Sequence, residues 1–203
     1  MPDLADLTAR MIAAARKAGA DQADALAVAA TSLSIDVRLG RLKQAERSEG
    51  TDIGLRVFVG RRSAIVSSSD TRDATLAEMA DRAVAMAREA PEDPFDGIAD
   101  PSQLARDTDS ARLDLCDAAP EPDPAELEDA ARRAEAAALA VEGVTQVQSA
   151  SAGYGRRQVH LAASNGFSAG YHRSDSGLSC TAIGGTGTAG ATDAAGAGAA
   201  GAG

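Results

Sequence analysis

The sequence predicts an α+β protein built from helices and antiparallel strands. Three observations predict this class. Apolar residues recur at the helical period in residues 3–19, they alternate with polar residues in residues 33–39, and Asn165-Gly166 is typical of a β-hairpin turn. The expected order is a helix, an antiparallel sheet and a helix, then an acidic connection, a further helix with an antiparallel hairpin sheet, and a disordered Gly/Ala tail.

The composition limits what the protein can do. Of 203 residues, 44% are hydrophobic but only 2% are aromatic, so the core must come from Leu, Val, Ile, Met and Ala. No window approaches 18 consecutive apolar residues, and the acidic start of the chain lacks a secretory signal, so we expect a cytoplasmic protein with no membrane association. The net charge of −10 repels phosphate backbones, which argues against nucleic-acid binding.

The first predicted region covers residues 1–90 and begins with a helix over residues 3–19. A second helix over residues 71–90 should be capped by Ser69, Asp70 or Thr71 and end at Pro91. Between them, glycines at hairpin spacing predict antiparallel strands with one apolar face and Asp36, Arg38 and Arg56 on the other. These strands are expected near residues 24–30, 32–39, 41–48, 52–60 and 62–68.

Residues 91–123 are predicted to form an acidic, Pro-rich surface connection. Residues 124–183 follow as a second folded region, in which Pro124 occupies the first turn of a helix that ends near residue 141. Its antiparallel strands are expected at residues 144–152, 156–163, 166–173 and 177–183. Residues 184–203 are almost entirely Gly, Ala and Thr, and are predicted to be a low-complexity tail because glycine is costly to order.

The two histidines are the first candidates for a metal site. A two-residue turn at Asn165-Gly166 would place His160 opposite Tyr171 and His172 on the other sheet face, so the two imidazoles could not share a metal. We therefore predict no metal ligands. Cys116 and Cys180 are too few for a four-thiolate zinc site.

The remaining motifs do not predict catalysis either. Ser67-Ser68-Ser69 fits a capping role, and the carboxylates that flank Cys116 disfavour a thiolate. Gly184-Gly185-Thr186-Gly187 lacks the lysine and the helix of a phosphate-binding loop, and the acidic connection lacks calcium-loop spacing. We predict no catalytic or cofactor-binding residues. An open sheet edge that accepts an extended peptide fits the strand pattern, unless a helix or another subunit covers that edge.

Several segments together resemble the N-terminal region of the TldD/PmbA family. They are Ile35–Leu42, Glu46–Gly50, Asp52–Arg62, Ser67–Asp70 and the helix Leu76–Ala90. Ala90–Asp100 and the hairpin Ser164–Tyr171 are more similar to the PmbA (TldE) branch than to the TldD branch. The resemblance covers residues 4–187.

The resemblance implies a subunit of a cytoplasmic, zinc-dependent peptidase pair that acts on unfolded peptides. TldD-like chains carry an H-E-x-x-x-H zinc helix, PmbA/TldE-like chains lack it, and no family zinc ligand maps onto this sequence. The expected function is therefore the N-terminal part of a non-catalytic PmbA/TldE-like subunit that supplies scaffold and a peptide-guiding surface. Its expected partner is a TldD-like subunit, which would hold the zinc, or a second copy of the chain.

Two alternatives stay open at this point. The chain could be a truncated TldD-like catalytic subunit whose zinc site lies beyond residue 187. It could also be a protein-binding adaptor, in line with the older family label of DNA gyrase modulator.

Overall fold

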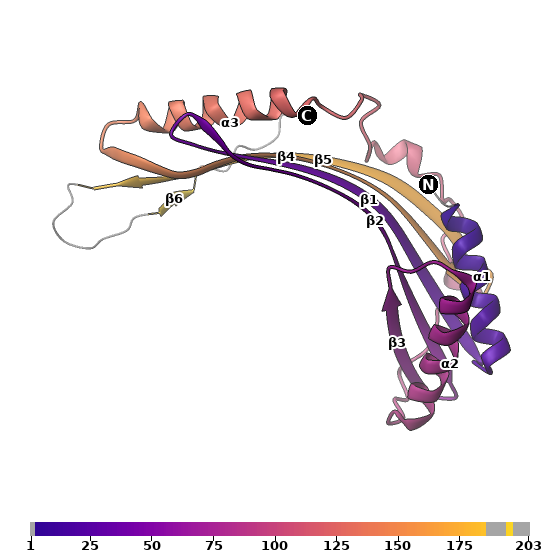
Figure 1. The fold of residues 1–203 in the computed structure, drawn as a ribbon. Helices are drawn as coiled ribbons and strands as arrows, with labels where there is room; N and C mark the ends of the chain where they lie inside the picture. Colours follow the sequence, from indigo (N-terminus) through magenta and orange to yellow (C-terminus); the bar gives the residue numbers. More distant parts are fainter. Residues whose placement is uncertain (1–2, 186–193, 197–203) are drawn as a thin grey trace. The chain divides into compact units, whose positions relative to one another are not determined.

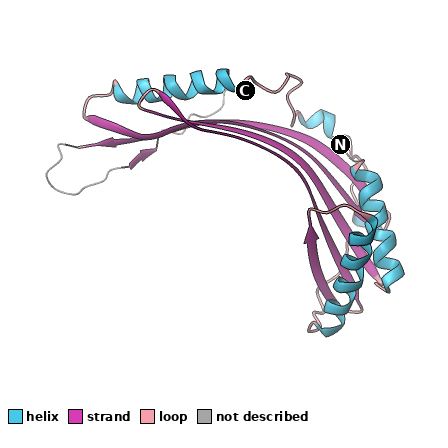
Figure 2. Cartoon of the chain, in the orientation of Figure 1, coloured by secondary structure: helices cyan, strands magenta, loops and turns pink. Residues whose placement is uncertain are grey.

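A computed structural model of the chain describes residues 3–185 and 194–196 (Figures 1 and 2). The described strands form one sheet in the order β3-β2-β1-β4-β5-β6. The longer elements are α1 (Leu4–Ala18), β1 (Gln22–Arg38), β2 (Arg41–Val59), β3 (Arg62–Ser68), α2 (Asp73–Glu89), α3 (Pro124–Leu139), β4 (Val144–Ala163) and β5 (Ser168–Gly184). Two short 3₁₀ helices, η1 (Pro101–Gln103) and η2 (Ser110–Leu113), lie between α2 and α3, and β6 is Ala194–Gly196. The predicted α+β class is confirmed.

The strands are longer than the sequence predicts. The expected breaks near residues 31 and 50 do not occur, so β1 and β2 each replace two predicted strands. The same is true of β4 and β5, which continue through the predicted turns at residues 153–155 and 174–177. Most of the predicted tail lies outside the described residues, but β6 pairs with β5 antiparallel, with Ile183 opposite Ala194.

Backbone conformation explains which predicted turns form. In the part of the chain before residue 186, the turns of the β1–β2, β2–β3 and β4–β5 hairpins contain glycines in the left-handed region, namely Gly40 (φ 69°), Gly60 (φ 62°) and Gly166 (φ 96°). The other predicted turn glycines lie within extended strands without a positive φ: Gly50, Gly153, Gly155 and Gly177. Glycines at hairpin spacing therefore form turns in this chain only where their φ is positive, and the others continue the strand.

The chain divides into two compact units, and each is assembled from three stretches of sequence. Unit 1 comprises residues 1–30, 49–115 and 157–173, and unit 2 comprises residues 31–48, 116–156 and 174–203. Four strands, β1, β2, β4 and β5, contribute residues to both units.

Unit 1 has the larger core. Helices α1 and α2 pack on alternate residues of the strands, and the shared buried set consists of Leu4, Leu7, Met11, Ile12, Ala15, Ala23, Ala25, Ala27, Ala29, Ile53, Leu55, Val57, Val66, Leu76, Met79, Ala80, Ala83, Val84, Ala87 and Ala162. In β4, Ala162 belongs to this core. Its neighbour Leu161 is 38% exposed and therefore faces the opposite side of the sheet. Arg38 and Arg56 each follow a buried residue of their strand and are themselves exposed or half-buried. This alternation agrees with the predicted sheet of one apolar and one polar face.

Unit 2 has a smaller core beneath α3. It consists of Leu33, Ile35, Val37, Leu127, Ala131, Val147, Ala150 and Ala152. Asp123 and Glu126 form a capping box at the start of α3, and Pro124 occupies the first turn as predicted. These capping bonds satisfy amide groups that the first helical turn leaves without partners.

The helix starts follow the predictions unevenly. Asp3 caps α1 by accepting hydrogen bonds from the amides of Ala5 and Asp6. The predicted side-chain cap of α2 is wrong, because the N-cap residue is Arg72, whose side chain makes no capping bond. Asp70 instead accepts hydrogen bonds from the backbone and guanidinium of Arg72 and from the hydroxyl of Thr75. The Arg72 guanidinium holds the pKa of the Asp70 carboxyl well below its usual range.

Candidate peptide-binding surfaces

The outer edge of β2 is open in unit 2. Strand β3 pairs with β2 only between Ile53 and Val59, so Arg41–Ser48 has β1 as its one neighbouring strand among the described residues. Every side chain in Arg41–Ser48 is exposed. An edge strand offers backbone N–H and C=O groups on the side that lacks a neighbouring strand, and these are the groups that an added strand would bind.

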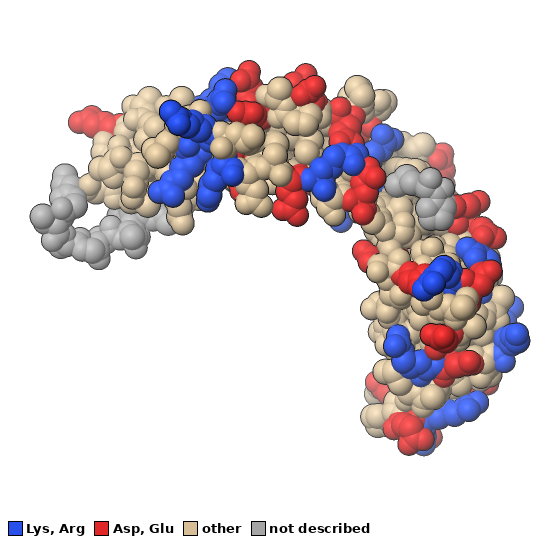
Figure 3. All heavy atoms as spheres, in the orientation of Figure 1, with Lys and Arg blue, Asp and Glu red and all other residues tan. Residues whose placement is uncertain are grey.

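The open edge carries positive charge near the β1–β2 turn. Arg38, Arg41 and Lys43 flank the β1–β2 turn in the sequence. Figure 3 shows a group of Lys and Arg side chains on the face in view, in the part of the molecule where Figure 1 draws α3. Further along β2, Arg47 donates two hydrogen bonds to the carboxylate of Glu121, at 3.1 and 3.3 Å. The chain is acidic overall, so this hairpin end is a local exception.

A buried carboxylate fixes the hairpin end. Glu135 of α3 is 3% exposed, and its two carboxylate oxygens accept hydrogen bonds from the amides of Leu39 and Gly40 at 2.6 and 2.7 Å. Both of these turn residues have positive φ. Charge-assisted hydrogen bonds of this kind are stronger than neutral ones, so Glu135 holds the first residues of the open edge in place.

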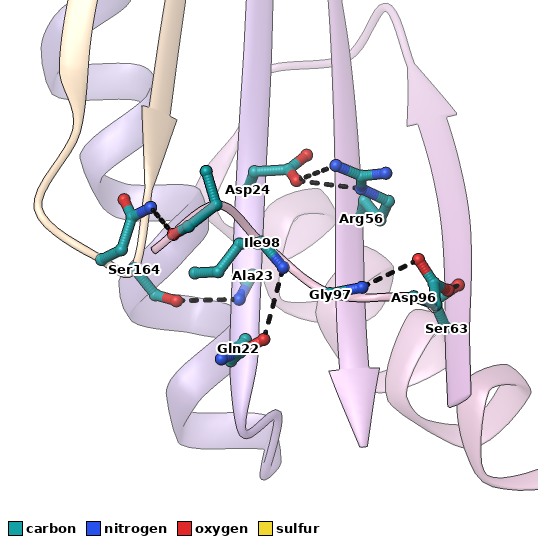
Figure 4. Close-up of polar contacts among 11 residues, drawn as sticks. Gln22, Ala23, Asp24, Arg56, Ser63, Asp96, Gly97, Ile98 and Ser164 are labelled. Atoms are coloured by element: carbon teal, nitrogen blue, oxygen red, sulfur yellow. Dashed lines mark hydrogen bonds and ion pairs between the residues drawn. The ribbon is translucent and has the colours of Figure 1, made fainter. Parts of the chain in front are cut away.

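The acidic connection is not a free surface loop in unit 1, because polar contacts fasten it to successive strands (Figure 4). Asp96 accepts a hydrogen bond from Ser63 of β3, and the amide of Ile98 donates to Gln22 of β1 at 3.5 Å. The carbonyl oxygen of Ala99 accepts a hydrogen bond from the Asn165 side chain at 2.8 Å. These contacts lead the connection across the sheet face that is opposite α1 and α2.

Two adjoining cavities separate the connection from this sheet face. The larger, of about 540 Å³, has an apolar floor from β4, β5 and the turn between them, and its other wall is residues 105–115. The smaller, of about 310 Å³, shares Ala105, Leu161 and Phe167 with the larger and extends to an ion pair between Asp24 and Arg56. In that pair the guanidinium lies 2.6 Å from the carboxylate, and it also stacks 5.1 Å from the ring centroid of Phe58.

The predicted placement of the two histidines is wrong. The β4–β5 turn has three residues, since the amide of Ala163 donates to the carbonyl oxygen of Phe167 at 2.9 Å. A Cβ at Gly170 would lie 3.1 Å from Cδ2 of His160, so His160 faces Gly170 and not Tyr171. Alternation along β5 then puts His172 on the same face as His160.

His160 joins the sheet to α1. Its Nδ1 lies 2.8 Å from the hydroxyl of buried Thr8, and its Nε2 lies 3.4 Å from the hydroxyl of Ser168. Burial lowers the pKa of His160, while Asp3 opposes this effect. Sequence reasoning missed this Ser168–His160 contact. Because Ser168 is exposed and Thr8 takes the position of an orienting carboxylate, the contact is a structural joint and not a hydrolytic triad.

The other sequence candidates lie apart. Ser68 accepts a hydrogen bond from the amide of Asp70 at 3.0 Å and so shapes the turn before α2. Cys116 and Cys180 are free thiols, and burial raises the pKa of Cys180, with a smaller contribution from Glu135. Residues 186 and 187 of the glycine motif lie outside the described residues.

A zinc site does not fit the residues that the structure describes. Within residues 3–185, His, Cys, Asp and Glu side chains form no group of three or more that could hold a metal ion. In the same part of the chain, no helix is long and apolar enough to cross a membrane.

Comparison with known proteins supplies the family. The profile of the PmbA/TldA metallopeptidase domain 1 matches residues 23–87, and that of the PmbA/TldA metallopeptidase central domain matches residues 117–202. The chain belongs to the PmbA/TldD family. The second match continues through the Gly/Ala-rich segment, although the sequence resemblance was expected to stop at residue 187. No curated protein sequence matches the chain at a significant level.

Solved structures share the fold of this chain. A candidate modulator of DNA gyrase from Bacteroides thetaiotaomicron has a TM-score of 0.81 at 20% identity, over 90% of this chain and 41% of its own. TldE from Thermococcus kodakarensis has a TM-score of 0.69 at 14% identity, over 89% of this chain and 40% of its own. A candidate gyrase modulator from Thermotoga maritima has a TM-score of 0.64 at 16% identity, over 92% of this chain and 41% of its own. This PmbA/TldD chain thus spans about two fifths of the length of the structures it matches.

Proposed function

We propose that this chain is the amino-terminal part of a TldE-like subunit that holds an unfolded, extended peptide for a zinc-dependent peptidase pair. The open β2 edge at Arg41–Ser48 carries this proposal, because main-chain hydrogen bonds to an added strand recognise a peptide regardless of its side chains. A peptidase that acts on unfolded chains of many sequences needs recognition of this kind.

In this proposal a TldD-like partner subunit provides the metal and the hydrolysis. The match to the PmbA/TldA metallopeptidase domains and the fold shared with TldE support the assignment to a peptidase-related subunit. The residues of this chain then contribute scaffold and position. Glu135 contributes by fixing the hairpin end from which the open edge begins.

Hydrogen–deuterium exchange with the 203-residue chain tests the proposal. Addition of an unfolded peptide should slow exchange of those amides in Arg41–Ser48 that point away from β1, and leave Ile53–Val59 unchanged, since β3 already pairs with those residues. The matched control is the same peptide methylated on alternate backbone nitrogens, which keeps every side chain but cannot donate along one edge. Equal protection by both peptides, or no protection at Arg41–Ser48, would refute strand addition.

A further inference from the structure

The floor of the larger cavity in unit 1 is an apolar hollow formed by Val159, Leu161, Phe167, Ala169 and Tyr171. The β4–β5 register places Leu161 opposite Ala169 and Val159 opposite Tyr171. Ala169 therefore lies between Phe167 and Tyr171 on one face of β5, so a small side chain separates two aromatic rings. This arrangement leaves room above Ala169 for one large apolar group.

The hollow is only partly covered by the protein itself. Leu161 and Tyr171 are each 38% exposed, and Leu113 on the opposite wall is 65% exposed. A volume of about 540 Å³ lies within the usual range of ligand pockets, roughly 300–1,000 Å³. A ligand that covers these side chains would remove apolar surface from water, which favours binding.

The polar groups of the cavity favour a positive charge next to that apolar group. Arg112 donates to the Asp107 carboxylate at 3.0 Å, so these two charges offset each other. Asp109 also lines the cavity and begins η2, with one carboxylate oxygen accepting from the amide of Ala111 at 3.0 Å. The hydroxyl of Ser110 donates to the carbonyl oxygen of Gly170 at 3.4 Å, which fastens η2 to β5. The net charge of these lining side chains is therefore negative.

We propose that this cavity binds the amino-terminal residue of a peptide when that residue has a large apolar side chain. The side chain occupies the hollow above Ala169, between Phe167 and Tyr171, and the α-ammonium lies at Asp109. A free amine with an aromatic group has the same chemistry, and the test below separates the two sources. The inference rests on the proposed function in one respect, namely that the chain binds unfolded peptide.

Tryptophan fluorescence gives a direct test, because the chain contains no tryptophan. The probes are the peptide amide Trp-Ala-Ala-Ala, its N-acetylated form and tryptamine. We expect a saturable blue shift of the peptide's emission, and about tenfold weaker binding after acetylation, the effect of losing one charge-assisted contact. Equal binding of the acetylated form would overturn the role of the ammonium. Equally tight binding of tryptamine would overturn the peptide assignment.

Variants of the chain localise the effect. Ala169→Phe should fill the hollow and abolish the blue shift, whereas Ser179→Phe, which adds the same ring at an exposed position of β5, should leave it unchanged. Asp109→Asn retains a capping oxygen and should weaken binding of the free peptide without affecting the acetylated one. Normal binding by Ala169→Phe would refute the site.

The two proposals fail separately. If the cavity assignment is wrong and strand addition is right, a longer peptide will still protect Arg41–Ser48 from exchange, and Ala169→Phe will not alter that protection. If strand addition is wrong and the cavity assignment is right, the fluorescence change will occur without protection of the β2 edge.

Discussion

In unit 1 the sheet has α1 and α2 on one face and residues 93–115 on the other, and β3 covers the edge of β2. In unit 2 the described residues place α3 on one face, and the β2 segment Arg41–Ser48 has a strand on one side only. Strand β2 is thus an inner strand in unit 1, where β3 lies at the edge of the sheet, and an edge strand among the described residues of unit 2. Pairing with β3 therefore uses the outer backbone groups of Ile53–Val59, whereas the outer edge of Arg41–Ser48 has no neighbouring strand among the described residues.

The largest expected contrast is between the two cores. Leu7→Ala, at a fully buried position of α1, should lower the free energy of unfolding by about 2–5 kcal/mol, because the tightly packed core cannot close the cavity. Leu127→Ala, at a 9% exposed position of α3, should lower the free energy of unfolding by about 2 kcal/mol, the lower end of that range, because a site close to the surface relaxes more easily. Urea unfolding followed by circular dichroism measures both. A greater loss for Leu127→Ala would reverse the proposed ranking of the units.

A second prediction concerns the carboxylate that holds the hairpin end. Glu135→Ala leaves the amides of Leu39 and Gly40 without their acceptor and should cost about 1–3 kcal/mol. Exchange of these two amides should accelerate, whereas unit 1 should be unaffected. Glu142→Ala, which removes an exposed carboxylate after α3, is the control. Unchanged exchange at Leu39 and Gly40 would show that the open edge does not depend on Glu135.

The smallest effect should be a pH dependence specific to unit 1. Because burial lowers the pKa of His160 in the folded chain, the unfolded chain binds more protons below about pH 6.5, and stability should fall as the pH is lowered from there. His160→Gln should flatten this part of the stability curve, as measured by urea unfolding at each pH. His172→Gln, which removes the other, exposed histidine, is the matched control. A flattened curve in the control would place the titrating group elsewhere.

The helices were predictable because local signals determine them. Helical periodicity and Asp3 define α1, and Pro124 marks the start of α3. The strands were less predictable, because a glycine such as Gly50 reads as a turn in the sequence although its backbone is extended. The neighbouring residues in the sequence do not distinguish Gly50 from Gly40. Gly40 has a positive φ and lies in a hairpin turn whose amides bind Glu135, far along the chain.

The candidate surfaces were hidden for the same reason. The notion of an open edge followed from the strand pattern, but its place depended on how far β3 pairs along β2. The cavity depended on the β4–β5 register, and the three-residue turn at residues 164–166 shifts that register from the one that Asn165-Gly166 suggests. The composition of the acidic connection is typical of a solvated loop. Only its long-range contacts, such as those of Ala99 with Asn165 and of Ser110 with Gly170, show that it covers a sheet face.

The division of each unit among three stretches of sequence limits how this polypeptide can be dissected. A cut between residues 115 and 116 would give two fragments that each carry part of both cores, with β1 on one fragment and its sheet neighbour β4 on the other. Neither fragment would contain the complete core of either unit. The core of unit 2 joins residues of β1 to residues of β4, so it can be completed only after β4 has been synthesised.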